Sequence, residues 1–278
     1  MKNVHLLGLG WAGLGMAECL KGHYELFGQD DSVWSTQIAQ SNGIDTSYSH
    51  QHDLRLPTPD KLVLANAGLA NTFLPDEYQI LCCQDKARTA KTIGDLAPKT
   101  YWLRDTDGAG GKGAQMISSF LPGRNYSCEF AVNHGKIIGS FVKERISYSL
   151  KYKTEGVENV GSSVVSVCRD NIEVIKIANL ALQCVADATK TELHGFYGID
   201  LKEDENGVPK VTEINAGRLL TASYCFFYLT NYNLALAGVK SYFNEDYTLG
   251  EYPTNYGILR TMDRPPVLCP PEVTERWI

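Results

Sequence analysis

Two short stretches, FYGIDL at residues 196–201 and VTEIN at residues 211–215, decide how the rest of this chain is interpreted. Both are mainly apolar and rich in residues that favour strands, and the sequence Glu205-Asn206-Gly207 between them is typical of a hairpin turn. In such a hairpin Asp200 and Glu213 lie roughly opposite each other. The two stretches therefore predict a pair of carboxylates that meet across adjacent strands.

Asn215 adds a third oxygen to this pair. It lies two residues after Glu213, so the two side chains share one face of their strand. Carboxylate and amide oxygens are hard ligands that suit Mg²⁺ held against the phosphates of a nucleotide. Burying carboxylates in apolar strands without a cation costs free energy, which favours a metal site at Asp200, Glu213 and Asn215. A polar hairpin that faces solvent and holds no metal is the alternative.

The composition argues against several classes of protein. The 278 residues carry a formal net charge of −6 and show no basic stripe, which argues against nucleic acid as a partner. No apolar run reaches the length of about 20 residues that a membrane-spanning helix needs, and the first residues do not resemble a signal peptide. The eight cysteines form no CxxC pair, so we expect free, mostly buried thiols in a reducing, cytoplasmic compartment.

The order of predicted elements divides the chain near residue 84. Before it, a strand at 3–9, a helix at 11–21 and a strand at 24–29 form a βαβ unit, typical of an α/β domain. After it, helices mix with antiparallel hairpins, which indicates an α+β domain followed by an irregular, proline-rich tail from residue 251. The other predicted elements are strands at 61–66, 78–83, 100–103 and 115–120, a loop at 45–59, a hairpin of 127–132 with 137–143, and helices at 85–96, 172–190 and 222–243.

Two glycine-rich segments could meet phosphate. The first, Gly8–Gly13, has the pattern GxGxxG between a strand and a helix, and Asp30 follows where a ribose-binding acid would lie. It is either a dinucleotide site or a tight turn that binds no dinucleotide. The second, Gly108–Gly113, could wrap phosphate oxygens with backbone N–H groups, and Arg104 precedes it; a plain surface loop is the alternative.

Taken together, these residues resemble the ATP-grasp superfamily, especially its carbamoyl-phosphate-synthase-like and D-alanine–D-alanine-ligase-like branches. Asp200, twelve intervening residues and then Glu213-Ile214-Asn215 resemble the metal-binding signature of that family. The resemblance runs from the amino terminus to about Arg218. It implies a Rossmann-like pre-ATP-grasp domain at 1–84 and an ATP-grasp domain at 85–250, with a central subdomain at 85–120 and a carboxy-terminal subdomain at 121–250.

The resemblance also implies the nucleotide contacts. The Asp85-Lys86 pair resembles the one that opens the central subdomain, and the segment 118–125 resembles the hinge that holds adenine. Arg104, Ser118 and Asn125 depart from the residues usual in the family, which are Lys and two acids. The implied phosphate and nucleotide contacts are Lys86, Arg104, Gly108, Gly110, Gly111, Lys112, Gly113, Ser119, Phe120, Leu121, Asn125 and Arg218, with Lys86, Arg104 and Arg218 in catalytic roles.

The function implied is ligation of a small carboxylate to an amine or related nucleophile through an acyl phosphate, with ATP and Mg²⁺ (or Mn²⁺) as cofactors. Gly10 and Trp11 of the glycine turn and Arg145 are candidate substrate contacts, and Ser162 and Ser163 could line the same cleft. Arg145 is equally compatible with a solvated charge run. Two rival functions are a nicotinamide-dependent oxidoreductase and a non-catalytic nucleotide-binding module, and a homodimer is left open.

Overall fold

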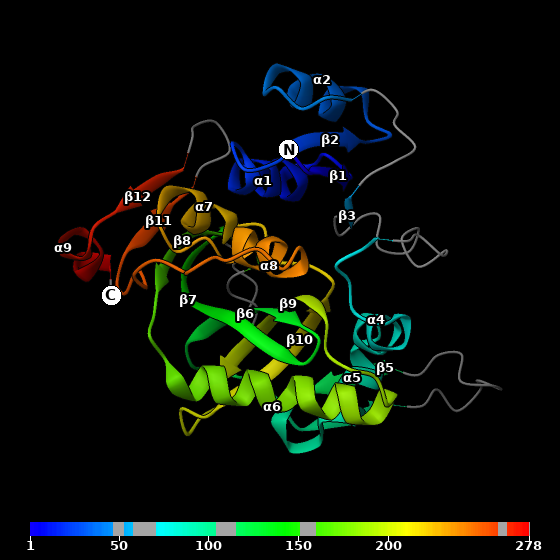
Figure 1. Cartoon of the computed structure of the whole chain (residues 1–278). Coiled ribbons are helices and arrows are strands. Elements are labelled where there is room, and N and C mark those ends of the chain that lie inside the picture. Colours follow the sequence, from blue (N-terminus) through cyan, green and yellow to red (C-terminus); the bar gives the residue numbers. More distant parts are fainter. Residues whose placement is uncertain (47–52, 58–70, 104–114, 151–159, 261–265, 278) are drawn as a thin grey trace.

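The computed structural model of the chain describes residues 1–46, 53–57, 71–103, 115–150, 160–260 and 266–277 (Figure 1). Three predictions lie outside these residues: the strand at 61–66, Arg104 and the glycine loop at 108–113. Ser162 lies within them, but its side chain is not described. Among the described residues the strands form three sheets, of three, seven and two strands. No helix among them is both long enough and apolar enough to cross a lipid bilayer.

The amino-terminal part is a parallel βαβ unit, as the sequence predicts. Its elements are β1 (Asn3–Leu7), α1 (Trp11–Leu20), β2 (Glu25–Gln29), α2 (Val33–Ser41) and β3 (Leu54–Pro57), and β1 pairs in parallel with both β2 and β3. The prediction of a loop throughout residues 45–59 is wrong, because β3 lies within it. Leu54 and Leu56 are buried on either side of a half-buried Arg55, the alternation expected of a strand.

The segment 78–83, predicted as a strand, is instead the helix α4 (Glu77–Gln84). The side chain of Asp76 caps its amino end by accepting a hydrogen bond from the backbone N–H of Tyr78. Ile80 and Cys83, three residues apart, are both buried, which is the spacing of one helix face. The predicted helix at 85–96 is confirmed as α5 (Lys86–Ile93) with a 3₁₀ turn at Gly94–Leu96, and β4 (Thr100–Leu103) pairs with β5 (Gln115–Ser118).

The large sheet contains both predicted hairpins and extends beyond them. Its strand order is β10-β9-β6-β7-β8-β11-β12. The prediction of an irregular tail is wrong in part, because its segments β11 and β12 pair antiparallel with each other and β11 extends the sheet by pairing with β8. The bounds are β6 (Asn125–Asn133), β7 (Lys136–Leu150), β8 (Val160–Cys168), β9 (Gly195–Glu203), β10 (Pro209–Ala216), β11 (Gly257–Leu259) and β12 (Val267–Cys269).

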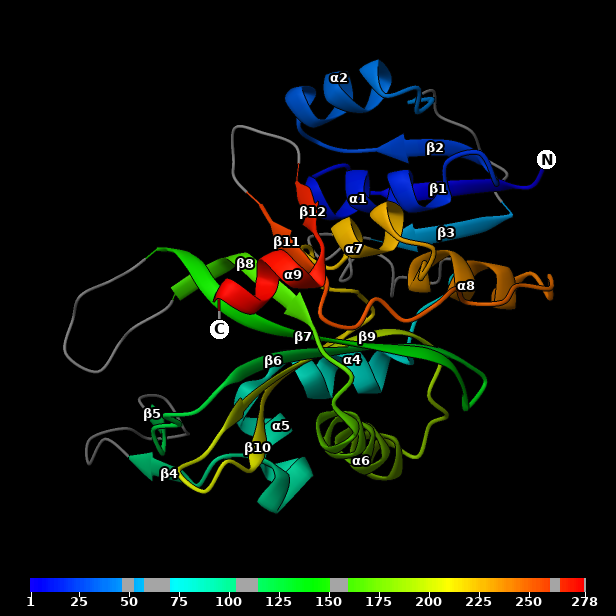
Figure 2. The ribbon, with the colours of Figure 1, turned by 90° about the vertical axis from the view of Figure 1, so that its left-hand side faces the viewer.

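Helices cover both faces of the large sheet (Figure 2). The predicted helix at 172–190 is confirmed as α6 (Ile172–Thr189). The single helix predicted at 222–243 is two helices, α7 (Tyr224–Leu229) and α8 (Leu234–Tyr242). Asn233 separates them, because its side chain caps α8 by accepting from the N–H of Leu236. A short helix, α9 (Pro271–Thr274), and a 3₁₀ turn, Glu275–Trp277, end the chain.

Two hydrophobic cores lie on opposite sides of the large sheet. One joins the sheet to α4, α5 and α6, and the other joins it to α7, α8 and the amino-terminal unit. In Figure 2 the amino-terminal unit stands on one side of the sheet and α6 on the other. Because Ile80, Cys82 and Cys83 of α4 belong to the first core, we propose that the boundary between the two parts precedes α4. All eight cysteines are free and seven of them are buried.

Candidate functional site

The predicted hairpin of the two carboxylates is present. β9 and β10 are antiparallel, with Glu213 opposite Asp200 and Asn215 opposite Gly198. The register shifts between Val211 and Glu213, which marks a β-bulge at this point. The predicted pairing of Asp200 with Glu213 across the hairpin is therefore confirmed.

Polar side chains from neighbouring strands share the face of the sheet that carries Asp200. Residues paired directly across strands point to the same face, and Asp200 pairs with Ser127 of β6, which pairs with Lys143 of β7. Further along the same face the residues become apolar, with Phe141 and Phe196 packed in the core beneath α7 and α8. The polar end of this face consists of Asn125, Ser127, Glu129, Lys143, Arg145, Asp200, Glu213 and Asn215. We call it the polar face, and it is the candidate site.

Asp200 is held by a guanidinium and a hydroxyl. Arg145 forms an ion pair with its carboxylate, and the hydroxyl of Ser127 donates to the same oxygen at 3.3 Å. The Nε of Arg145 also donates to the Ser127 hydroxyl at 2.8 Å, which closes a ring of contacts. Burial raises the pKa of Asp200, and the charge of Arg145 acts in the opposite direction. Arg145, which the sequence predicts as a substrate contact, is therefore paired in the structure with Asp200, a predicted metal ligand.

Glu213 faces a lysine from a different element. The ammonium of Lys86 lies 3.3 Å from a carboxylate oxygen of Glu213, and both side chains are well exposed, at 60% and 35%. Lys86 is the first residue of α5, directly after Asp85, whose side chain caps that helix by accepting from the N–H groups of Ala87 and Arg88. The cap fixes where α5 begins and so places Lys86 beside β10.

Asn215 also has a basic partner. The guanidinium of Arg218 donates a hydrogen bond to its side-chain oxygen. Between them Gly217 has a φ of 91°, a left-handed conformation that favours glycine, and its N–H donates to the carbonyl of Phe196. The turn brings Arg218 back toward the strand that it follows. Each predicted metal ligand therefore touches one basic side chain: Arg145, Lys86 or Arg218.

The donor set of the polar face suits a divalent cation together with a polyphosphate. Within the described part of the chain no three His, Cys, Asp or Glu side chains are grouped so as to hold a metal by themselves. Asp200 and Glu213 supply carboxylates and Asn215 an amide oxygen, a set that Mg²⁺ accepts when phosphate oxygens complete its shell. Basic groups contact all three oxygens in this structure, so a metal ion bound there would take the place of these cations.

The predicted hinge lies at the same end of the sheet. Ser119 is anchored through its N–H to the carbonyl of Lys99 at 2.8 Å, Leu121 is buried, and Phe120 is 69% exposed. The ammonium of Lys202 lies 5.1 Å from the centre of the Phe120 ring, and Lys202 pairs across strands with Asn125. A cavity of about 540 Å³ borders Ser119, Phe120 and Leu121, but none of the predicted metal ligands lines it.

The glycine turn and Asp30 make a closed structural unit. Gly8 has a φ of 99°, and the carboxylate of Asp30 accepts from the N–H of Leu9 at 2.6 Å and from that of Ser32 at 2.7 Å. Both oxygens of Asp30 are therefore engaged with backbone, which accounts for an acid at this spacing without a ribose. Gly10 precedes α1, and Trp11 is 67% exposed at its first position.

Sequence reasoning missed a buried polar cluster next to the site. The ammonium of Lys143 lies 3.0 Å from a carboxylate oxygen of Glu129 and also donates to the hydroxyl of Ser223. The second oxygen of Glu129 accepts from the N–H of Leu220 at 2.9 Å. These contacts hold the segment that follows Arg218 against the polar face. A signal was present, since Glu129 interrupts an otherwise apolar strand.

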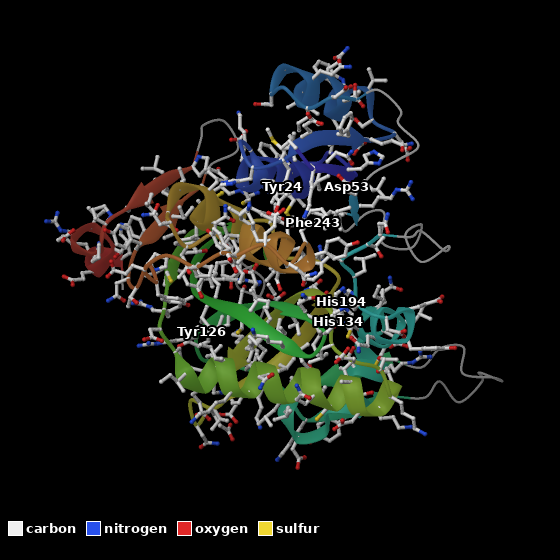
Figure 3. The ribbon with its side chains drawn as sticks, viewed as in Figure 1. Tyr24, Asp53, Tyr126, His134, His194 and Phe243 are labelled. Atoms are coloured by element: carbon white, nitrogen blue, oxygen red, sulfur yellow. The ribbon has the colours of Figure 1, made fainter. Side chains whose placement is uncertain are left out.

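Two histidines lie together near the start of β9, before the strand reaches Asp200 (Figure 3). The centres of the His134 and His194 rings are 4.5 Å apart. The backbone N–H of His134 donates a hydrogen bond to Nδ1 of His194 at 3.2 Å. His134 is exposed and pairs with Glu192 at 3.3 Å. Burial, followed by the neighbouring His134, lowers the pKa of His194 to about 4.

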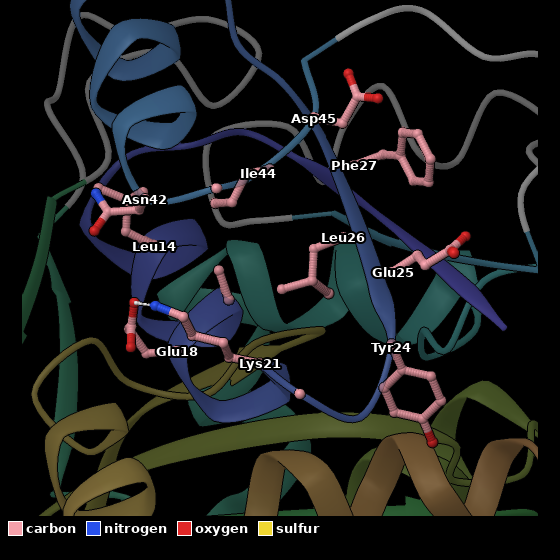
Figure 4. Close-up of a pocket in the computed structure, with 13 residues that line it drawn as sticks. Leu14, Glu18, Lys21, Tyr24, Glu25, Leu26, Phe27, Asn42, Ile44 and Asp45 are labelled. Carbon is pink, nitrogen blue, oxygen red and sulfur yellow. Dashed lines mark hydrogen bonds and ion pairs between the residues drawn. The ribbon is translucent and has the colours of Figure 1, made fainter. Parts of the chain in front are cut away.

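A large cavity lies in the amino-terminal unit, apart from the polar face (Figure 4). It measures about 610 Å³ and lies between α1, β2 and residues 42–45. Leu14, Leu26 and Ile44 give it an apolar lining, and Glu18 and Lys21 pair at its rim at 3.5 Å. It contains none of the predicted site residues, so cavity size alone does not identify the site.

No protein-family model matches the chain, and no curated protein sequence matches it. Solved structures do. A protein of Archaeoglobus fulgidus, provisionally assigned to the ATP-grasp superfamily, aligns over 97% of this chain and 98% of its own with a TM-score of 0.63 and 18% identity. The chain has the ATP-grasp fold.

Other structures with this fold are similar to the chain to the same degree. Phosphoribosylamine–glycine ligase of Thermotoga maritima aligns over 95% of this chain and 82% of its own, with a TM-score of 0.66 and 15% identity. N5-carboxyaminoimidazole synthetase of Staphylococcus aureus, solved with ADP, aligns over 94% and 82%, with a TM-score of 0.64 and 11% identity. At these identities the likeness concerns the ATP-grasp fold itself, and the chemistry must be argued from the residues.

Proposed function

We propose that this chain is an ATP-dependent ligase that activates a carboxylate as an acyl phosphate and transfers the acyl group to an amine or related nucleophile. One observation carries the proposal. Asp200, Glu213 and Asn215 lie together on the polar face of an ATP-grasp fold, and each touches a basic side chain from another position in the chain. Oxygen ligands interleaved with Lys and Arg are what a magnesium–triphosphate complex requires.

In this proposal the nucleotide lies between the small β4–β5 sheet and the polar face. Ser119, Phe120 and Leu121 hold the adenine, and the amide of Asn125 binds a ribose hydroxyl. Arg104 and the loop Gly108–Gly113, both outside the described residues, join Lys86 and Arg218 at the phosphates. The ADP bound to the similar Staphylococcus aureus enzyme supports a nucleotide in this fold.

Magnesium, when bound by Asp200, Glu213 and Asn215, neutralises the charge of the phosphates during transfer. The basic residues of the chain can change partners to help. Lys86 and Arg218 now contact Glu213 and Asn215, and each can turn to a phosphate oxygen when the metal occupies those ligands. Arg145 stays with Asp200 and Ser127, and its charge opposes the rise that burial causes in the pKa of that carboxylate.

The two steps balance without a protein nucleophile. A substrate carboxylate oxygen bonds to the γ-phosphorus as ADP leaves, and an amine then bonds to the acyl carbon as inorganic phosphate leaves. The amine proton passes to solvent. The chain's part is to orient both substrates and to keep water from the acyl phosphate.

An ADP-release screen over carboxylates and amines with ATP and Mg²⁺ tests the proposal. We expect at least one pair to release ADP, and Glu213→Ala to slow that release by at least about 100-fold because a metal ligand is lost. Glu173→Ala, at the exposed start of α6, is the matched control and should behave as the wild type. Unchanged turnover in Glu213→Ala would remove Glu213 from the site. ATP binding without ADP release in every mixture would indicate a non-catalytic nucleotide-binding module.

A further inference from the structure

Arg260 is placed by the strands that extend the sheet beyond the polar face. It directly follows β11, and its N–H donates to the carbonyl of Val164 in β8 at 2.8 Å. Ile258, two residues earlier, pairs with Ser166, which in turn pairs with Arg145. Because residues paired across strands share a face, Arg260 extends from the same side of the sheet as Arg145.

The guanidinium of Arg260 has a ring beside it and, among the described residues, no acid paired with it. Its central carbon lies 6.0 Å from the centre of the Trp11 ring, within the range of a cation–π contact. Its Nη1 is buried and makes no hydrogen bond, and within the described part of the chain no carboxylate forms an ion pair with it. A buried donor of a charged group that lacks an acceptor is costly, so Arg260 is ready for an anionic partner.

Arg145 and Arg169 differ from Arg260 in this respect. Arg145 is paired with Asp200, and Arg169 lies 2.8 Å from a carboxylate oxygen of Glu144. Arg218 donates to the neutral amide of Asn215. Arg260 alone of these four side chains carries a buried N–H with no acceptor on the described chain.

The surroundings of Arg260 connect it to the glycine turn. Trp11 opens α1 directly after Gly10, and a Cβ added at Gly10 would meet no described atom within 4 Å, so the space there is open. The helix α7 also lies close to Arg260, because the charge of Arg260 lowers the pKa of Cys225 in that helix against the larger effect of burial, which raises it. Figure 2 shows β11 and β12 beside α1 and α7.

We propose that Arg260, supported by the Trp11 ring, recognises an anionic group, a carboxylate or a phosphate, on one substrate of this chain. The assignment to a substrate rests on the proposed ligase function. The Trp11 ring limits the orientations of the guanidinium beside it, and the N–H groups of the guanidinium can donate to oxygens of the anion. The group recognised is remote from the reacting carboxylate, so the site fixes which acids or acceptors the enzyme takes.

Calorimetric titration with inorganic phosphate and with succinate tests the site directly. We expect saturable binding of at least one of them to the wild type and a loss of affinity of about tenfold or more in Arg260→Gln. Arg276→Gln removes the same charge from an exposed position in the last turn and should bind as the wild type does. Whether phosphate or succinate binds more tightly identifies the anion. Equal affinities in wild type and Arg260→Gln, or no binding of either anion to the wild type, would overturn the proposal.

Two further variants test whether the Trp11 ring contributes to anion binding and whether the anion binds at the triphosphate position instead. Trp11→Ala leaves the guanidinium but removes the ring, so weaker anion binding is expected, and unchanged binding would remove Trp11 from the site. Lys86→Gln removes a proposed nucleotide contact and should keep the anion response; loss of that response would move the anion to the triphosphate position and overturn the role of Arg260.

A separate titration with Mg²⁺ and ADP distinguishes this inference from the proposed function. Wild type and Arg260→Gln should bind the nucleotide equally, which also shows that the variant is folded. Anion binding through Arg260 in a chain that binds no nucleotide would uphold the anion site and overturn the ligase. Nucleotide binding with no effect of Arg260 on either anion would overturn the anion site and leave the ligase proposal standing.

Discussion

Two lysine–glutamate pairs each include a carboxylate of the polar face, Glu129 or Glu213, and are built in opposite ways. Lys143 and Glu129 are 1% and 0% exposed, and their remaining contacts go to Ser223 and to the backbone of Leu220. Lys86 and Glu213, in contrast, are 60% and 35% exposed, and their ion pair is their principal contact. The Lys143–Glu129 pair is buried and held by further hydrogen bonds, whereas the Lys86–Glu213 pair is exposed and can exchange partners.

This difference assigns different work to the two pairs. A buried ion pair is costly to break, because the charge left behind cannot be solvated. An exposed pair contributes little to stability and can be opened by a ligand at small cost. We infer that Glu129 and Lys143 position the segment that follows Arg218, whereas Glu213 and Lys86 serve the nucleotide. Variants that separate stability from turnover can break or sharpen this contrast.

Breaking the buried pair should have the largest effect. Lys143→Met leaves the Glu129 carboxylate buried without its cation, so we expect the free energy of unfolding to fall by about 3–5 kcal/mol. Urea denaturation followed by circular dichroism measures it. Adding Glu129→Gln to that variant should restore much of the loss, since the uncompensated charge is gone. A loss under about 1 kcal/mol in the single variant would contradict a structural role.

The exposed pair should show the reverse behaviour. Lys86→Gln should change the unfolding free energy by less than about 1 kcal/mol, as exposed ion pairs do. Release of ADP should slow by about 10²–10³-fold, because a cation at the transferring phosphoryl group is removed. Lys176→Gln, on the exposed side of α6, is the control for both measurements. Destabilisation without loss of turnover would show that the two pairs are alike.

Within the described part of the chain, the carboxylate of Asp30 has backbone groups as its partners. Asp30→Ala removes acceptors from the N–H groups of Leu9 and Ser32, so we expect a loss of about 1–2 kcal/mol in thermal or urea unfolding. NADH titration of the wild type and the variant should show no binding by either. Saturable NADH binding to the wild type that Asp30→Ala abolishes would restore the dinucleotide interpretation of the glycine turn.

The fold was predictable where the deciding interactions are local. The hairpin of Asp200 and Glu213 follows from alternation of side chains and a turn at Gly207, all within about 20 residues of sequence. The helix α4 was mistaken for a strand because its apolar run fits both, and burial against α6 and β10 decides for the helix. β11 and β12 are three residues each and exist because the edge of β8 is available, which no local pattern reveals.

The acidic residues of the candidate site could be predicted from the sequence, but the basic residues that pair with them could not. The spacing of Asp200 and Glu213 lies within one hairpin. Their cations come from elsewhere, Arg145 from β7 and Lys86 from the start of α5, so only the folded sheet pairs them. Arg260 was not singled out by any motif, because its significance lies in what it lacks, a partner for a buried N–H.

The smallest expected effect concerns a third pairing, that of His194 with the backbone of His134. Nδ1 of His194 accepts a hydrogen bond there, so protonation of this nitrogen would break the bond, and burial lowers the pKa of His194 to about 4. The unfolded chain has a His pKa near 6.5. Above about pH 6.5 His194 is neutral in both the folded and the unfolded chain, so the free energy of unfolding does not change with its titration. As the pH falls from about 6.5 to 4 the unfolded state alone takes it, so stability decreases.

His194→Gln removes this dependence. Between pH 7 and 4.5 we expect the wild type to lose more stability than the variant, by on the order of 1 kcal/mol, since solvent screens a ring that is only partly buried. Thermal unfolding at several pH values measures the difference, and His23→Gln, exposed in the turn after α1, is the control. Parallel curves for wild type and His194→Gln would show that this ring takes its proton as easily in the folded chain as in the unfolded one. Burial alone would then be insufficient to separate fixed from exchangeable polar groups in this molecule.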